Sequence, residues 1–395
     1  MKILLHDYGG YPFTLQLGMC LAEAGHRVHY LYSQSTQQVQ RITPKRGDAL
    51  FSCEGIRLTQ PFEKYHFLKR RRAEIEHGHT AARQVLRFTP DVVISANTPL
   101  DAQALLQDTS RKIGAKFIYW FQDAIGLATC HALSKKLPLV GPFIGVYYRW
   151  KEKSLLHRSH QIILISEAFM PLMDAYKIST HKIHVIPNWA PLNEITPYGH
   201  HNPWAEQMGL ANTFNFLYTG VLGLKHDPSI FLSMANHFKS ETDIRIVVVS
   251  GGDYLAWLRS EREIRRLDNL VLLDFQPPGV YPQVLAAGDV LIGILNSEAG
   301  DYAVPSKVMS YLCAQRPILL SSPLGNTAAQ VVTRAGAGLV SAPNDFADLL
   351  GKAEHIYACA DLRDAMGQSG RDYAVRHFDI QKISQAFEHL ISGSR

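Results

Sequence analysis

Two stretches in the carboxyl-terminal half of the chain carry residues that could hold a phosphorylated ligand. The first, residues 218–228 (YTGVLGLKHDP), follows an apolar segment that is predicted to be a strand. Its glycines let a phosphate approach backbone N–H groups, and its lysine adds a mobile cation. The candidate binding residues in this stretch are Gly220, Gly223 and Lys225.

The second stretch, residues 296–307 (NSEAGDYAVPSK), lies between an apolar strand and a predicted helix that begins near its serine at 306. It combines two carboxylates, a hydroxyl, a lysine and the free N–H groups of a helix start. This combination suits a ligand that has both sugar hydroxyls and a diphosphate. A plain loop with a helix cap would need neither the lysine nor the two acids. The candidates here are Glu298, Asp301, Pro305, Ser306 and Lys307.

Near the amino terminus, Gly9-Gly10 follows the first predicted strand and precedes a helix, where a phosphate or a sugar could reach backbone N–H groups. The spacing is not the GxGxxG of dinucleotide-binding proteins. The second strand runs into residues 33–35 (SQS) rather than into the acid that would bind a ribose. An NAD-dependent oxidoreductase is therefore disfavoured, and a tight turn without a ligand stays open for Gly9 and Gly10.

Apolar strands alternate with amphipathic helices almost from end to end, which is typical of parallel sheets built from βαβ units. Because the strands are nearly continuous runs of Val, Ile and Leu, both faces of each sheet should be buried, as in doubly wound α/β folds. Strands are predicted at residues 2–6, 27–32, 91–96, 116–121, 161–165, 182–186, 215–218, 245–250, 270–274, 290–295, 317–320 and 338–340. In the first half, helices are predicted at residues 14–24, 72–88, 102–113, 144–157 and 167–176.

The alternation stops at residues 187–203, where four prolines indicate a linker between two Rossmann-like domains. We therefore predict domains at residues 1–195 and 196–375, followed by a carboxyl-terminal helix at 376–395. A length of 395 residues agrees with two domains. The charge is uneven, with a net +9 on the first 200 residues and −4 on the remainder, so the first domain is the one expected to meet an anionic partner.

The composition also excludes several classes of protein. Five cysteines, odd in number and never in CxxC spacing, disfavour a disulfide framework or a structural zinc site and favour a reducing compartment. We find no signal-peptide apolar region and no apolar run long enough for a spanning helix. The 18 histidines form no HxH or HExxH pattern, so no metal site is predicted.

Several segments, taken in order, resemble glycosyltransferase family 4, especially bacterial enzymes of colanic acid and related polysaccharide biosynthesis. The resemblance rests on residues 218–228, on 304–308 (VPSKV), 311–314 (YLCA) and Arg316-Pro317, and on 185–189 (VIPNW). Gly9-Gly10 and residues 24–28 (AGHRV) are similar to the amino-terminal signature of the family. The resemblance extends over essentially the whole chain.

This resemblance implies an α/β fold of the GT-B type, in which two Rossmann-like domains face each other across a cleft and the carboxyl-terminal helix packs back across the interface. It implies a retaining hexosyltransferase that takes a sugar from a nucleotide sugar and needs no metal or other cofactor. Lys225 and Lys307 would neutralise the donor diphosphate as it leaves, which is the main catalytic requirement. Glu298 and Asp301 would hold the sugar or the ribose, and Asp123 would face the acceptor.

Two positions depart from the family pattern. The usual pair of glutamates seven residues apart is not intact, because Ser310 stands at the second position and the first falls near Tyr302. Asp301 or Glu298 would have to substitute. The usual glycine before the Arg-Pro pair is Gln315, a change that we expect to affect only a turn.

An apolar segment at residues 137–148 is flanked by cations, an arrangement suited to lying on an anionic membrane surface. A core helix with solvated ends is the alternative. A second basic tract, residues 69–72 (KRRR), is either part of the same surface or a charged loop. No nucleic-acid-binding module accompanies these tracts, so nucleic acid is not an expected partner. The candidate membrane contacts are Lys135, Lys136, Arg149, Trp150 and Lys151.

We therefore expect a cytoplasmic enzyme, peripheral on the inner face of the cytoplasmic membrane, that transfers a sugar to a growing, lipid-linked cell-surface glycan. A nucleotide-sugar epimerase of the same fold is an alternative. The imperfect glutamate pair also leaves open a catalytically silent protein that binds nucleotide sugars.

Overall fold

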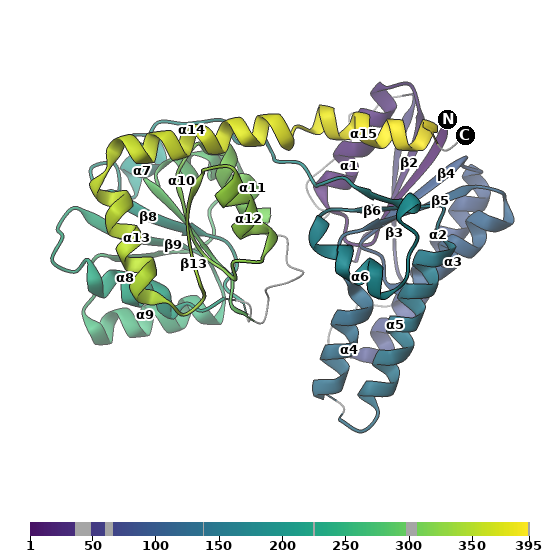
Figure 1. Cartoon of the computed structure of the whole chain (residues 1–395), viewed down its shortest axis with the longest axis horizontal. Helices are drawn as coiled ribbons and strands as arrows, with labels where there is room; N and C mark the ends of the chain where they lie inside the picture. Colours follow the sequence, from purple (N-terminus) through teal and green to yellow (C-terminus); the bar gives the residue numbers. More distant parts are fainter. Residues whose placement is uncertain (36–48, 60–65, 137, 224–225, 298–305, 394–395) are drawn as a thin grey trace. The chain divides into compact units, whose positions relative to one another are not determined.

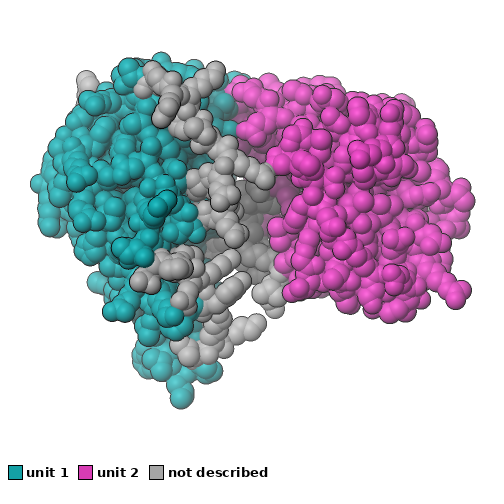
Figure 2. Space-filling view, turned by 180° about the vertical axis from the view of Figure 1, so that it is seen from behind, with its two compact units in different colours: residues 1–188, 380–395 teal, residues 189–379 magenta. Residues whose placement is uncertain are grey.

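The computed structural model describes residues 1–35, 49–59, 66–136, 138–223, 226–297 and 306–393. The chain divides into two compact units, residues 1–188 with 380–395, and residues 189–379 (Figure 2). The predicted boundaries at 195 and 375 are therefore both displaced. Ala190 and Ile195 belong to the hydrophobic core of the second unit, and the helix that ends at His377 also belongs to that unit.

The first unit is built on a seven-stranded parallel sheet with the order β3-β2-β1-β4-β5-β6-β7. Its strands are β1 (Lys2–Asp7), β2 (Arg27–Ser33), β3 (Phe51–Ile56), β4 (Val92–Ala96), β5 (Lys116–Phe121), β6 (Gln161–Leu164) and β7 (Ile183–Val185). Only β3 is missing from the prediction. Its sequence, FSCEGI, mixes polar with apolar residues, as suits a strand at the edge of a sheet, whereas the prediction relied on continuous apolar runs.

The helices of the first unit include a long pair that the sequence predicts only in part. The α-helices of this unit that precede the linker are α1 (Pro12–Glu23), α2 (Phe67–Phe88), α3 (Leu100–Lys112), α4 (Ile125–Lys136), α5 (Gly141–Arg158) and α6 (Met170–Ala175). Figure 1 shows α4 and α5 side by side, extending together beyond the sheet. The sequence of α4, IGLATCHALSKK, has few large apolar residues because its main packing partner is the neighbouring helix α5.

The second unit is built on a six-stranded parallel sheet with the order β10-β9-β8-β11-β12-β13. Its strands are β8 (Phe214–Thr219), β9 (Ile244–Val249), β10 (Leu270–Leu273), β11 (Val290–Ile294), β12 (Ile318–Ser321) and β13 (Gly338–Ser341). Its helices are α7 (Pro203–Gln207), α8 (Ser229–His237), α9 (Asp253–Arg265), α10 (Tyr281–Ala286), α11 (Ser306–Cys313), α12 (Thr327–Arg334), α13 (Phe346–Ala358) and α14 (Ala360–His377). The prediction of two Rossmann-like domains is confirmed.

Both faces of the second sheet are buried, as its continuous Val, Ile and Leu runs predict. Along β8, Phe216 and Tyr218 enter one hydrophobic cluster, whereas Leu217 between them enters the other. Successive side chains of a strand point to opposite faces, so one apolar run supplies two cores.

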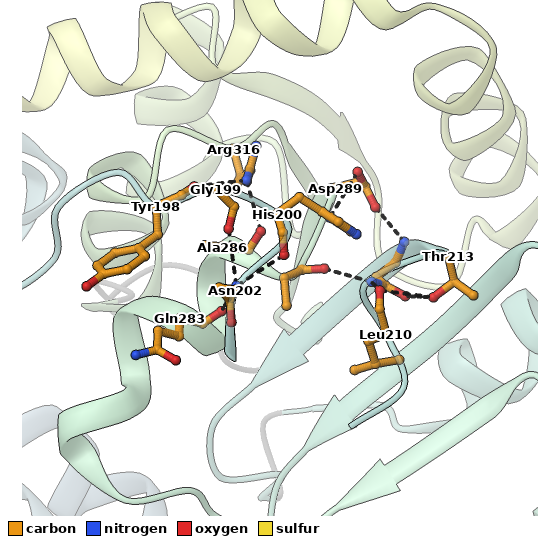
Figure 3. A network of polar contacts seen from close by, with 12 residues as sticks. Tyr198, Gly199, His200, Asn202, Leu210, Thr213, Gln283, Ala286, Asp289 and Arg316 are labelled. Atoms are coloured by element: carbon orange, nitrogen blue, oxygen red, sulfur yellow. Dashed lines mark hydrogen bonds and ion pairs between the residues drawn. The ribbon is translucent and has the colours of Figure 1, made fainter. Parts of the chain in front are cut away.

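The linker between the units is fastened to the second unit by a polar network (Figure 3). Asn202 donates to the carbonyls of Gly199, His200 and Gln283 at 3.1–3.2 Å. Arg316 donates to the carbonyls of Tyr198 and Ala286 at 3.2 and 2.9 Å. Because Arg316 lies just before β12, at the amino-terminal edge of the sheet, the Arg-Pro pair of the family pattern anchors the linker.

The last helix, α15 (Ile380–Gly393), belongs to the first unit, so the chain that leaves the first unit at the linker returns to it at its end. Phe387 of α15 is fully buried and meets the Trp120 ring edge-on at 5.0 Å between centroids. The predicted carboxyl-terminal helix begins at Ile380 rather than at 376, because α14 continues to His377.

In both sheets the strand order reverses beside the first strand, between β1 and β4 and between β8 and β11. Open α/β sheets bind their ligands outside the carboxyl ends of the strands at such reversal points. Gly9-Gly10 follows β1 in the first unit. In the second unit, Gly220 follows β8, and Lys307 lies in the first turn of α11, the helix that follows β11. The fold therefore brings the chemistry-bearing stretches to the two positions where ligands are expected.

Candidate functional site

Lys307 and Gly220 meet at the reversal point of the second unit. Lys307 lies in the first turn of α11, and its ammonium donates a hydrogen bond to the Tyr218 hydroxyl. The same nitrogen lies 4.0 Å from the centroid of the Tyr218 ring. Gly220 has a φ of +133°, and a Cβ on this residue would lie 2.7 Å from the Lys307 nitrogen. The glycine is therefore required both by the backbone conformation and by the approach of the lysine.

The Lys307 ammonium is poorly compensated in this position. Burial lowers its pKa from 10.5 to about 8. Among the residues that the structure describes, no carboxylate forms an ion pair with it. A half-buried cation held against an aromatic ring, with an open glycine turn beside it, is an arrangement that an anionic ligand would stabilise.

The turn that carries Gly220 is held by the surrounding backbone and by a buried tyrosine. The Gly220 N–H donates to the Val249 carbonyl at 3.0 Å, and the Thr219 N–H donates to the Tyr311 hydroxyl at 3.3 Å. Tyr311 is fully buried on α11, the helix that also carries Lys307. One helix thus fixes the turn and supplies the cation that lies against it.

Several predicted members of this site lie outside the described residues: Lys225, Glu298, Asp301 and Pro305. Ser306 begins α11. Gly223 lies six residues before Ser229, where α8 begins, and its N–H donates to His226 Nδ1 at 3.0 Å. Gln315, which replaces a glycine of the family pattern, has a φ of +57°, so the usual glycine suits the left-handed turn after α11.

In the first unit, the Gly9-Gly10 loop is built around the buried carboxylate of Asp7. Asp7 accepts hydrogen bonds from the N–H groups of Gly9 and Tyr11, each at 2.8 Å, and from the Thr14 hydroxyl at 3.0 Å. Gly10 has a φ of +65°, which the turn requires and which favours glycine. Burial raises the pKa of Asp7 from 3.8 to about 7, against the effect of these hydrogen bonds.

Asp7 therefore gives an expected pH dependence. The pKa of Asp7 is higher in the folded state than in the unfolded state. As pH rises from about 4 to about 7, the unfolded protein therefore loses this proton whereas the folded protein retains it. The free energy of unfolding should fall across this range, with this carboxyl contributing at most about 1.4 kcal/mol per pH unit. In denaturant unfolding at several pH values, Asp7→Asn should have a shallower slope than wild type, and the exposed control Asp268→Asn should not. Equal slopes for all three proteins would contradict this role.

Asp123 follows β5. The pKa of Tyr11 is raised by burial, then by the charge of Asp7 and by the charge of Asp123, so Asp123 lies near this tyrosine. The predicted residues Asp123 and Gly9-Gly10 are thus neighbours at the carboxyl edge of the first sheet. Glu152 of α5 fixes the helix that starts beside Asp123, because its buried carboxylate accepts from the Gly126 N–H at 2.8 Å. Sequence reasoning missed Glu152, which looks like one more charge within a basic tract.

A second missed feature is a buried histidine pair behind the Gly9-Gly10 loop. His6 Nε2 lies 2.8 Å from His77 Nε2, and His6 Nδ1 lies 2.9 Å from the Thr98 hydroxyl. Burial lowers the pKa of His77 to about 4 and the pKa of His6 well below its usual value, so both rings are neutral. The sequence does not reveal this pair, because one histidine lies in a strand and the other in a helix. The only sequence signal is the position of His6 directly before Asp7, at the end of β1.

The predicted membrane residues lie on α4 and α5. Lys151 forms an ion pair with Asp101 and is mostly buried, so it is removed from the candidate membrane contacts. Trp150 is 63% exposed, and Arg149 is also exposed. Lys135 and Lys136 end α4, but the positions of their side chains are not among those described. Within the described ranges, no helix is both long and apolar enough to cross a membrane.

An exposed apolar stripe lies on α5 and the turn before it, within and just after the apolar segment at residues 137–148 that the sequence indicates. Phe143 is 77% exposed, and Val146, Tyr147 and Trp150 follow it at helical spacing, also exposed. Leu139 in the turn is 87% exposed. We call these five residues the α5 stripe. The opposite face of α5 buries Tyr148, Leu155 and Leu156, so the sequence shows an apolar segment but not which side of it faces solvent.

Known proteins resemble the chain in both sequence and fold. Residues 9–189 match the family model of the glycosyl transferase 4-like domain. No curated protein sequence matches the chain.

Three solved structures are similar over nearly their whole length. HepE from Anabaena in complex with UDP has a TM-score of 0.73, 15% identity and full coverage of both chains. Sucrose-phosphate synthase from Thermosynechococcus elongatus has a TM-score of 0.74, 14% identity and coverage of 100% of this chain and 98% of its own.

The third structure is WaaG, a glycosyltransferase involved in lipopolysaccharide biosynthesis, with a TM-score of 0.69, 14% identity and coverage of 99% of this chain and 100% of its own. At these identities the structural likeness shows the fold, and the family model shows the relationship of the first unit. The predicted resemblance to glycosyltransferase family 4 is thereby confirmed. The chain is a two-domain protein of the GT-B fold, and its residues 9–189 match the family model of the glycosyl transferase 4-like domain.

Proposed function

We propose that this protein is a retaining glycosyltransferase that transfers a hexose from a nucleotide-diphosphate sugar to a lipid-linked, cell-surface glycan. The observation that carries the proposal is the approach of Lys307 to Gly220 at the reversal point of the second sheet. HepE, a neighbour of the same fold, is solved with UDP and with UDP-glucose, which supports a nucleotide sugar as the donor.

In the proposed reaction, the donor diphosphate lies along the Gly220 turn and the Lys307 ammonium neutralises the negative charge that grows as the bond to the sugar breaks. Because a nucleoside diphosphate is a good leaving group, charge stabilisation of this kind carries most of the catalysis. Removing one preorganised donor of this type costs about 10²–10³ in rate. Lys307 can meet this need without a metal, since its charge lies at the turn before the donor arrives.

Other residues have supporting roles in this proposal. Lys225 and Gly223 would complete the diphosphate site, with Ser306 and Pro305 at the start of α11, and Glu298 and Asp301 would hold the sugar or the ribose. On the acceptor side, the N–H groups of the Gly9-Gly10 loop would hold an acceptor oxygen, and Asp123 would orient its hydroxyl. The position of Asp123 beside Tyr11 and Asp7 supports this assignment.

Two alternative functions are separated by the products formed from the donor. Release of the nucleotide only when an acceptor is supplied supports transfer. An isomerised donor that forms without acceptor indicates an epimerase, and donor binding without turnover indicates a silent binding protein.

We also propose that the enzyme works at the inner face of the cytoplasmic membrane and that the α5 stripe enters the lipid headgroup region. Five large apolar side chains exposed along one helix face and its preceding turn support this contact, with Arg149 beside them to meet anionic headgroups. The net positive charge of the first 200 residues favours the same surface.

The double substitution Phe143→Ser/Trp150→Ser should reduce binding to phosphatidylglycerol-containing vesicles by at least tenfold in cosedimentation. Burial of each of these side chains is worth about 1.5–3 kcal/mol. The control Ile264→Ser/Leu324→Ser replaces two similarly exposed apolar residues of the second unit and should bind like wild type. Equal vesicle binding by all three folded proteins would exclude the α5 stripe as the membrane contact.

A further inference from the structure

A cavity of about 960 Å³ opens in the first unit between α2 and the chain that leaves β3. Arg57 and Thr59 line it from the β3 side, and Lys69, Arg72, Glu76 and Arg83 line it from α2. The volume is within the range of small-molecule binding sites. None of these residues has a part in the transfer reaction proposed above.

The α2 side of the cavity follows helical geometry. Arg72, Glu76, His79 and Arg83 recur at intervals of four, three and four residues, so they lie along one face of the helix over successive turns. Lys69, Arg72 and Arg83 of α2 and Arg57 from the opposite side therefore line the same space, and Glu76 is the carboxylate among the described residues that line it.

Within the described part of the chain, that carboxylate forms no ion pair with the arginines. Both oxygens of Glu76 are engaged by Thr59, one by its N–H at 2.8 Å and the other by its hydroxyl at 3.0 Å. Among the residues that the structure describes, Arg57 and Arg72 have no carboxylate partner. Arg83 donates to the Thr80 hydroxyl at 2.9 Å, which leaves its charge uncompensated.

The neighbouring arginines of the same basic tract behave differently. Arg70 pairs with Glu74 at 2.7 Å, and Arg71 pairs with Asp101 at 2.8 Å. Within this tract, Arg70 and Arg71 therefore form ion pairs with protein carboxylates, whereas Arg72 lines the cavity. Guanidinium groups that form no ion pair with a protein carboxylate suit phosphate oxygens, which they bind bidentately.

We propose that the cavity between β3 and α2 binds a diphosphate group, held by Arg57, Arg72 and Arg83. Thr59 and Glu76 join the two walls and keep the arginines of α2 opposite Arg57. This site uses none of the residues proposed for the sugar donor, and the proposal does not depend on the protein being a glycosyltransferase.

The test is calorimetric titration of the full chain with inorganic pyrophosphate at low salt, in a Lys307→Ala background so that the donor site does not contribute. We expect pyrophosphate to bind and the added pair Arg72→Gln/Arg83→Gln to weaken this binding by at least tenfold. The matched pair Arg87→Gln/Lys112→Gln removes two exposed charges from the last turns of α2 and α3, and should change the affinity by less than twofold.

A second arm identifies the source of the phosphate. If Arg72→Gln/Arg83→Gln also lowers binding to phosphatidylglycerol vesicles, and pyrophosphate competes, the cavity takes lipid headgroups. If vesicle binding is unchanged while pyrophosphate binding is lost, it takes the diphosphate of a single soluble or lipid-linked molecule. The proposal is overturned if pyrophosphate does not bind, or if the two pairs of substitutions weaken it equally while thermal melting shows both proteins folded.

Discussion

Replacing Lys307 by alanine should lower the rate of sugar transfer by about 10²–10³ and weaken the binding of nucleoside diphosphates, while the protein stays folded. The reason is local: this ammonium is the charge that lies against the Gly220 turn, and no described carboxylate competes for it. Removing a half-buried cation should not destabilise the protein, because burial already disfavours its charged form. Transfer rates under saturating donor, with calorimetric nucleotide affinities, measure both effects.

The pH dependence of nucleotide affinity distinguishes loss of the Lys307 charge from loss of the volume of its side chain. With a pKa of about 8, Lys307 in the free protein loses its proton as pH rises from about 7 to 9, so nucleotide affinity should fall over that range. Lys307→Arg keeps its charge and should bind nucleotide independently of pH there. A folded Lys307→Ala protein with wild-type affinity and rate would refute the role of this residue.

The second large effect is expected at Gly220. A Cβ at this position would lie 2.7 Å from the Lys307 nitrogen, in the space that the lysine side chain occupies. An alanine would also have to adopt a φ of +133°. Gly220→Ala should therefore displace the ammonium from the turn and reduce nucleotide affinity at least tenfold, because the lysine and the backbone N–H groups no longer converge. Calorimetry with the nucleotide that wild type binds is the direct measurement.

Gly351→Ala is the control, since Gly351 is exposed on α13, a Cβ there meets no atom within 4 Å, and Gly351 has no positive φ. Nucleotide affinity within about threefold of wild type is expected for this variant. If both alanine variants lose affinity equally, the loss in Gly220→Ala does not come from displacement of Lys307.

Much of the fold can be read from the sequence because its strands are buried on both faces. Such strands have apolar residues at successive positions rather than at alternate ones, and β11 (VLIGI) therefore stands out without any knowledge of its neighbours. β3 does not, since an edge strand is only partly covered, and α4 does not, since one packed helix partner requires few large apolar residues.

The sequence predicts which types of residue form the candidate site, but it does not predict which of their side chains are in contact. Glycine and lysine in loops after strands indicate a phosphate site, and strand order then brings Gly220 and Lys307 together. The contact of Lys307 with Tyr218 depends on the packing of α11, and the pairing of Lys151 with Asp101 depends on how α5 lies along α3. The latter explains why an apparently exposed cation near the apolar segment is buried.

The central claim is that the Gly220–Lys307 turn binds a nucleotide-sugar donor, and thermal shift with a panel of nucleotide sugars that includes UDP-glucose tests it most directly. A ligand that binds the folded state raises its stability in proportion to the logarithm of the ratio of its concentration to its dissociation constant. The account predicts that at least one nucleotide sugar stabilises wild type and that Lys307→Ala loses most of this shift. If no nucleotide sugar stabilises wild type, or if the shift is the same in Lys307→Ala, the claim is contradicted.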